Sequence, residues 1–319
     1  MKNLYYFMML NIMNLLVLLI ILLIGIAFLT LLERKILGYV QMRKGPNKVG
    51  VLGFIQPFSD AIKLLTKELF YIYKSNYNLF YMCPMFLFSL MLIMWLLFPY
   101  NTNIYFLNYS ILLMFIFMTL GSYMLIIMSW SSNSIYSMMG AIRSVSQMLS
   151  YEVSFILIIF VLMFMSESYT LTDFVKYQVN LWFLLVFYPL FLIYFISIIV
   201  ELNRSPMDLI EGESELVSGF NVEYFSSGFT LIFLGEYGMI IFFSYVSVIL
   251  FTSLISGTDI SVMILTIIFS LLIIFMRGLL PRLRYDELMY LCWKVILPLI
   301  LVYIIMIVGL KFMIFYIKY

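Results

Sequence analysis

Five glutamates could take part in proton chemistry because they lie within or beside long apolar stretches of the sequence. They are Glu33, Glu152, Glu201, Glu223 and Glu236. An ionisable group at membrane depth costs about 2.5–3.5 kcal/mol on insertion scales, so it usually faces a protein interior or water. Buried carboxyl groups close to one another titrate together, and a proton can sit on any of them. One such glutamate could simply make a hydrogen bond between helices, but five together predict a proton relay.

A second group of acids lies in residues 201–226. It holds six carboxylates and a single cation, Arg204; the acids are Glu201, Asp208, Glu211, Glu213, Glu215 and Glu223. A solvated acidic loop is the simplest interpretation of such a run. Gly212, Gly219 and several apolar residues instead favour a folded loop. Packed against arginines of other loops, it would form a charged chamber at the membrane surface; these arginines are Arg34, Arg43, Arg143, Arg277, Arg282 and Arg284.

The composition limits the chemistry that this chain can perform alone. It has no His, which excludes imidazole acid–base catalysis, His-ligated zinc and the usual haem ligand. Only Cys83 and Cys292 are present, whereas an iron–sulfur cluster normally needs four thiolates. The sequence contains no glycine-rich dinucleotide or phosphate loop. We therefore expect no metal or redox cofactor on this chain, and any such cofactor must belong to a partner.

The elements that position these residues must be membrane helices. The 319 residues are 65% apolar and 11% charged, against about 25% charged in soluble proteins. A spanning helix needs about 20 mostly apolar residues. We predict an all-α membrane protein, a single domain over 1–319, with eight spans at about 11–32, 80–99, 110–130, 143–165, 181–201, 227–250, 260–277 and 292–312.

The cations support this topology. With eight spans, one side holds fourteen Lys and Arg residues, and the other side, with both termini, holds Lys2, Lys176, Lys311 and Lys318. Loops with excess Lys and Arg stay on the inner side of the membrane, so both termini are expected on the outer side. In the first inner loop, Phe58, Ile62 and Leu65 recur at helical spacing. This predicts an amphipathic helix in the membrane interface, although a simple basic anchor to lipid remains an alternative.

Several of these segments resemble membrane subunit 1 of mitochondrial NADH:ubiquinone oxidoreductase, respiratory complex I, and its bacterial H-subunit relatives. The similarity extends over essentially the whole chain. The matching runs are ERKILGY at 33–39, RKGPNKVG at 43–50, QPFSDAIKL at 56–64, GAIRSVSQ at 140–147, SYEV at 150–153, EGESELVSGFNVEY at 211–224 and PRLRYDELM at 281–289.

The resemblance implies a proton-pumping enzyme subunit with ubiquinone as substrate, located in the mitochondrial inner membrane with its large loops in the matrix and both termini in the intermembrane space. NADH, FMN and the iron–sulfur clusters would belong to partners, which include the peripheral-arm quinone-reducing subunits, neighbouring membrane-arm subunits and lipids, and no nucleic acid. By matched motif, the proton relay would use the five glutamates named first. The quinone chamber would be formed by Arg34, Arg43, Asp60, Glu68, Arg143, Arg204, Asp208, Glu211, Glu213, Glu215, Arg277 and Arg282.

Two other classes of function also fit part of the pattern. A secondary ion transporter would contain buried carboxylates, but it usually has an internal repeat, and the two halves of this sequence show no self-similarity. A purely structural docking subunit would explain the basic loops. It gives no reason for Glu152 and Glu236 at membrane depth.

Overall fold

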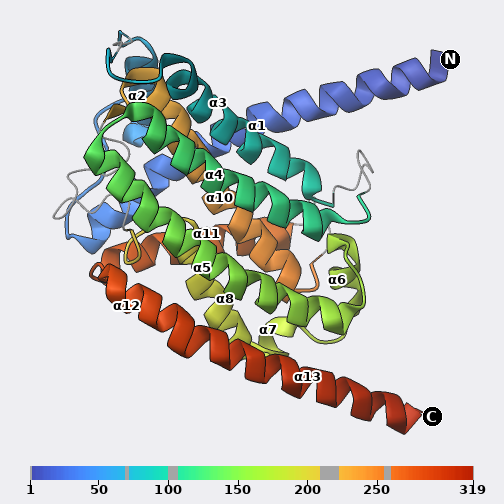
Figure 1. Ribbon diagram of the computed structural model, residues 1–319. Helices are drawn as coiled ribbons and strands as arrows, with labels where there is room; N and C mark the ends of the chain where they lie inside the picture. The colour runs from blue at the N-terminus through green and yellow to red at the C-terminus, as the bar shows by residue number, and fades with distance from the viewer. Residues whose placement is uncertain (1, 69–71, 100–106, 209–222, 255–259, 319) are drawn as a thin grey trace.

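The computed structural model describes residues 2–68, 72–99, 107–208, 223–254 and 260–318, and within these ranges the chain is helical with irregular connections and no strand (Figure 1). Seven helical segments are long and apolar enough to cross a membrane. They are α1 (Lys2–Val40), α3 (Tyr77–Met94), α4 (Ser110–Ser132), α5 (Ile135–Ser166), α10 (Ser226–Phe251), α11 (Ile260–Leu279), and a C-terminal segment made of α12 (Tyr285–Tyr290), the π-helical η4 (Leu291–Ile296) and α13 (Leu297–Lys318).

The span predicted at 181–201 is not one continuous helix, so the prediction of eight uninterrupted spanning helices is not confirmed. It is divided into α7 (Phe183–Val186) and α8 (Tyr188–Glu201) by Phe187, whose φ of −114° and ψ of 42° are not helical. Pro189 lies in the first turn of α8. Proline fits there because the first helical N–H groups have no intrahelical acceptor. The 14 residues of α8 extend about 21 Å, less than the apolar core of a bilayer.

The amphipathic helix predicted in the first inner loop is present as α2 (Gln56–Leu65). Its apolar residues Phe58, Ile62 and Leu65 are exposed on one face. The ring of Phe58 also meets the edge of Phe28 on α1, with 5.9 Å between ring centroids. A short 3-10 turn, η1 (Val51–Gly53), precedes α2, and a second one, η2 (Trp95–Leu97), extends α3.

The core is built around α5 and α10. Among the spanning helices, these two have the largest fraction of buried residues. Aromatic side chains fill it. Phe155 stacks on Tyr194 of α8 at 5.5 Å and meets the edge of Phe243 at 5.9 Å. Tyr194 also contacts Phe251 at 4.9 Å. This packing fixes α8 between α5 and α10, and α8 ends on Glu201.

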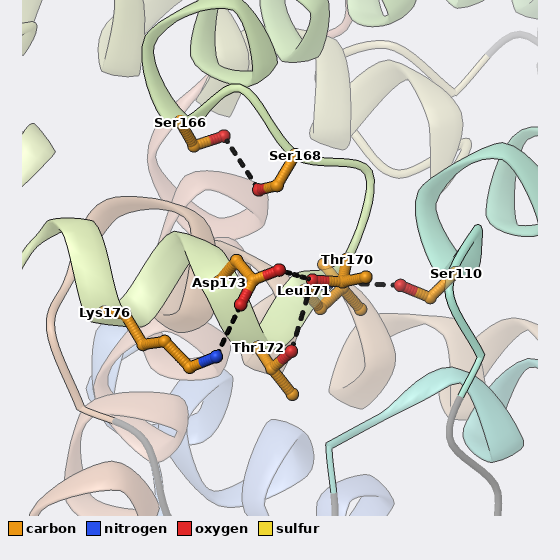
Figure 2. Close-up of polar contacts among 8 residues, drawn as sticks. All are labelled: Ser110, Ser166, Ser168, Thr170, Leu171, Thr172, Asp173 and Lys176. Carbon is orange, nitrogen blue, oxygen red and sulfur yellow. Dashed lines mark hydrogen bonds and ion pairs between the residues drawn. The ribbon is translucent and has the colours of Figure 1, made fainter.

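One end of the bundle carries both chain termini and the short helix α6 (Leu171–Tyr177), while α2 lies at the other end (Figure 1). Figure 2 shows how α6 begins: the Leu171 N–H donates to Ser110 Oγ at 3.1 Å, and the Thr170 hydroxyl donates to Asp173 at 2.5 Å. Asp173 also accepts from Lys176 at 2.6 Å. The bond to Ser110 satisfies a backbone N–H at the helix start that would otherwise lack a partner, and the two bonds to Asp173 join side chains of the first turns.

Candidate functional site

Glu33 lies between two arginines from distant parts of the sequence. Its Oε1 forms an ion pair with Arg204 at 3.1 Å and a second, shorter one with Arg277. Glu33 is 4% exposed and Arg204 is 9% exposed, so this is a buried pair, whereas the Arg277 side chain is 35% exposed. Burying a charge is costly unless it is paired. The three side chains therefore hold the ends of α1, α8 and α11 together.

Local structure explains why these three side chains meet. Glu33 lies seven residues before the end of α1 at Val40. Arg204 follows α8 through a tight reversal in which its N–H donates to Ile199 O at 3.4 Å and Asn203 adopts a left-handed φ of 48°. Arg277 lies in the last turn of α11, where a cation also interacts favourably with the helix dipole.

Tyr237 completes this cluster. The guanidinium of Arg204 lies 4.3 Å from the centre of the Tyr237 ring, and Tyr237 interacts electrostatically with both Glu33 and Arg204. Burial is the largest single influence on the pKa of Arg204 and lowers it, but Glu33, Tyr237 and Glu236 together outweigh burial and hold the pKa above its usual value. Arg204 also interacts electrostatically with Glu236. It thus connects a carboxylate on α1 with one on α10.

A cavity of about 80 Å³ lies beside this cluster, between α3, α4, α8 and α10. Glu201, Asn203 and Glu236 line it together with apolar side chains. Glu201 also interacts electrostatically with Glu152 on α5. The structure therefore brings four of the five predicted relay glutamates into one group of neighbouring side chains: Glu33, Glu152, Glu201 and Glu236.

Some buried polar atoms near the cavity have no hydrogen-bond partner within the described part of the chain. They are Gln147 Oε1, Glu152 Oε1 and Asn203 Oδ1. Gln147 is fully buried and donates its amide N–H to Met207 O at 2.8 Å, which fixes its side chain. Buried polar atoms are normally bonded to protein or to ordered water. This part of the structure is suited to hold water molecules or a shared proton.

Two further ion pairs, each with a partly exposed arginine, lie at the end of the bundle that carries α2. Arg34 pairs with Asp60 of α2 at 2.6 Å, and Gln56 donates to the other oxygen of Asp60 at 2.9 Å. Arg282 pairs with Asp208 at 3.6 Å. Asp208 is buried, whereas about a third of the Arg282 side chain is accessible. Each carboxylate fixes a guanidinium that keeps donors available to a ligand.

Other predicted site residues lie elsewhere or beyond the described ranges. Arg43 is exposed and bonds Gln41, Glu68 is exposed, and Arg143 is half-buried within α5. Glu223 lines a separate cavity of about 30 Å³ with residues of α3 and α10. Glu211, Glu213 and Glu215, which were predicted for the quinone chamber, lie outside the described residues. Among the described residues, no group of three or more Cys, Asp and Glu side chains could hold a metal ion.

Residues 13–308 match the NADH dehydrogenase family model. The chain is 48% identical over 307 residues to NADH-ubiquinone oxidoreductase chain 1 of Aedes aegypti, covering 95% of this chain and 96% of the relative. The chain belongs to this family. The same protein of Locusta migratoria is 47% identical, with 97% and 98% covered, and that of Emballonura alecto is 42% identical, with 91% and 93% covered. The predicted membership, a membrane subunit of NADH:ubiquinone oxidoreductase in the respiratory chain, is confirmed.

Two residues of this complex I subunit's site were not predicted from its sequence. Tyr237 is one of 25 tyrosines and carries no distinctive pattern, so only the rotation of α10 reveals that it faces Arg204. Gln147 could have been identified, because an amide within a long apolar segment is costly unless it has a partner.

Proposed function

We propose that this chain forms the membrane part of the quinone chamber of complex I and the first part of the carboxylate path that couples quinone reduction to proton translocation. The observation that supports this most strongly is Arg204, which pairs with Glu33 and interacts with Glu236 beside the cavity that Glu201 also lines. A docking subunit would not need such a costly set of buried charges. A change of charge near Arg204 would therefore alter the electrostatic energy of Glu33, Glu236 and Glu201 together.

The chamber would lie at the end of the bundle where Arg34, Arg277 and Arg282 are half-exposed. Their partners are Asp60, Glu33 and Asp208, respectively. Guanidinium groups donate hydrogen bonds to carbonyl and oxyanion oxygens, so this rim suits the two oxygens of a quinone and the charge that develops on them. The electrons come from a cluster on a partner subunit, because this chain lacks the ligands for one.

Reduction of ubiquinone to ubiquinol requires two electrons and two protons. The negative charge that arrives with the electrons would act strongly on nearby ion pairs, because Coulomb energies are larger inside a protein than in water. Attraction between this charge and Arg277 or Arg204 would weaken their hold on Glu33 and Glu236. Protons would then redistribute among Glu33, Glu236, Glu201 and Glu152, and the relay would pass the signal into the membrane arm.

The proposed setting is the mitochondrial inner membrane. In this topology α7 and α8 together complete an eighth crossing despite the break at Phe187, with the large loops in the matrix and both termini in the intermembrane space. Two observations support it: both termini project from one side of the bundle (Figure 1), and fourteen of the eighteen cations fall on the other side of the eight-crossing scheme. The partners would be the peripheral-arm subunits and neighbouring membrane-arm subunits.

A photoreactive quinone analogue tests the chamber. In the intact complex, irradiation is expected to label peptides from residues 33–68 and 201–208, and excess ubiquinone is expected to prevent the labelling. Arg282→Met would reduce labelling, while Arg284→Met, which removes a neighbouring exposed cation paired with Asp286, serves as the matched control. Labelling confined to other subunits would instead favour a docking role for this chain.

A further inference from the structure

A separate pocket of about 430 Å³ lies at the end of the bundle that carries the chain termini. It opens between the end of α5 and α13, and its lining combines aromatic side chains with one cation and one carboxylate. The lining includes Phe160, Phe164, Glu167, Tyr169, Lys311 and Phe312. Its volume falls in the range of sites for small organic molecules. Glu167 lies fifteen residues after Glu152, about 22 Å further along the chain axis, so this pocket is distinct from the carboxylate group.

The two charged groups of the pocket are held side by side. Lys311 Nζ lies 2.7 Å from Glu167 Oε1, donates to Phe164 O, and is 4.7 Å from the centre of the Phe164 ring. Glu167 ends α5 in a left-handed conformation with φ 53°, which directs it away from the helix. The Glu167 side chain is 68% exposed and the Lys311 side chain 27% exposed. Both charges can therefore be reached from outside, at adjacent positions.

The position of the pocket corresponds to the headgroup level of a bilayer. It lies at the C-terminal ends of two spanning segments, Ile135–Ser166 and Tyr285–Met313. Tyr169, half-exposed at its edge, is the residue type that is enriched at membrane interfaces. Phe160 lies about one turn further into the span than Phe164, and both rings offer apolar surface to an acyl chain.

We propose that this pocket binds the headgroup of one zwitterionic phospholipid with a primary amine, whose phosphate contacts Lys311 and whose ammonium contacts Glu167. The presence of one cation and one carboxylate at adjacent positions selects this class. An anionic headgroup would meet the Glu167 carboxylate, which repels it. A choline headgroup has no N–H to donate to Glu167. An ethanolamine headgroup satisfies both charges, while its chains lie along Phe160 and Phe312 in the groove between α5 and α13.

Photoactivatable analogues of three phospholipids, with ethanolamine, choline and glycerol headgroups, test this proposal in the purified complex. Mass spectrometry would quantify labelled peptides that contain Phe160–Tyr169 or Lys311–Met313. We expect the ethanolamine lipid to label about five-fold more than either other lipid, equivalent to about 1 kcal/mol. Glu167→Gln is expected to abolish this preference, and Lys311→Met to lower labelling by all three.

Lys176→Met is the matched control, because Lys176 is an exposed cation at the same end of the bundle and pairs with Asp173. It is expected to leave labelling of the pocket unchanged. Because Glu167→Gln retains the Lys311 bond to Phe164, it remains informative if Lys311→Met fails to assemble. Equal labelling by the three lipids, preference for the anionic lipid, or cross-links to another protein chain at these residues would overturn the proposal.

Discussion

Replacing Arg204 with Met should be among the most destabilising single changes in this chain. The side chain is 10% exposed and lies 3.1 Å from a Glu33 carboxylate that is 5% exposed. Two unit charges at about 4 Å interact by about 4 kcal/mol at an effective dielectric constant of about 20. Removing one partner of a buried pair typically costs about 3–5 kcal/mol, because the other charge is left buried. Arg277 still pairs with Glu33, so we expect about 3 kcal/mol.

The measurement is the release of this chain from the purified complex across a urea series, with stability differences taken from the midpoints and slopes. Arg34→Met is the matched control. It removes an arginine from an ion pair of similar length, 2.6 Å, but one whose side chains are 53% and 32% exposed. Such exposed pairs contribute about 0.2–1 kcal/mol. Arg277→Met is expected to fall between the two, because Arg277 is 35% exposed.

A double-mutant cycle isolates the pair itself. Glu33→Gln combined with Arg204→Met should cost less than the sum of the single changes, since it leaves no unpaired buried carboxylate. If Arg204→Met costs no more than Arg34→Met, or if the cycle gives no coupling, the buried pair does not stabilise the protein more than the exposed one does.

Three further predictions concern other parts of the fold. Gly53→Ala should destabilise the turn before α2, because Gly53 has φ +82° and an added Cβ would lie 2.2 Å from Pro46 O. Gly309→Ala is the control, because its added Cβ meets no atom within 4 Å. Proteolysis of residues 41–56 should rise in Gly53→Ala only. Tyr151→Phe removes the hydroxyl that donates to Leu288 O at 3.0 Å and should lower the same urea midpoint by about 1 kcal/mol, while Tyr316→Phe, at an exposed site, should not. Hydrogen bonds from Lys176 and Thr170 lower the pKa of Asp173, so the stabilisation of α6 by Asp173 is complete above the ordinary aspartate pKa and is lost as pH falls through the lowered pKa. Hydrogen-exchange protection of the α6 amides, corrected for the pH dependence of intrinsic exchange, should show this loss. Asp173→Asn should remove the pH dependence of that protection.

Much of this fold could be predicted from hydropathy alone. Windows of about 20 apolar residues located seven spanning segments, and the helix bounds differ mainly because helices continue beyond the bilayer, as α1 does to Val40. The break at Phe187 is different. Pro189 was a local signal for it, since proline is favoured in the first turn of a helix and therefore marks a new helix start just after Phe187. A hydropathy window shows that a segment is apolar enough to lie in lipid. It does not show whether the helix in that segment is continuous.

The site was predictable in its residue types and less so in its partners. Glu33 and Arg204 are 171 residues apart, and charge alone could not assign Arg204 to Glu33 rather than to the neighbouring acids of its own loop. Packing decides it, because the reversal after α8 turns Arg204 towards α1. The contribution of Tyr237 depends on the rotation of α10, which the largely apolar sequence around it does not specify. Its position had to come from the structure.

Coupling of quinone reduction to proton movement by the buried carboxylates is tested most directly by the number of protons that the complex translocates per NADH oxidised in sealed vesicles. Glu152→Gln combined with Glu201→Gln should lower this ratio, because neither amide can carry a proton between neighbours. Asp286→Asn, an exposed acid paired with Arg284, should leave it unchanged. A full proton ratio in the Glu152/Glu201 double variant would show that these carboxylates do not couple quinone reduction to proton movement.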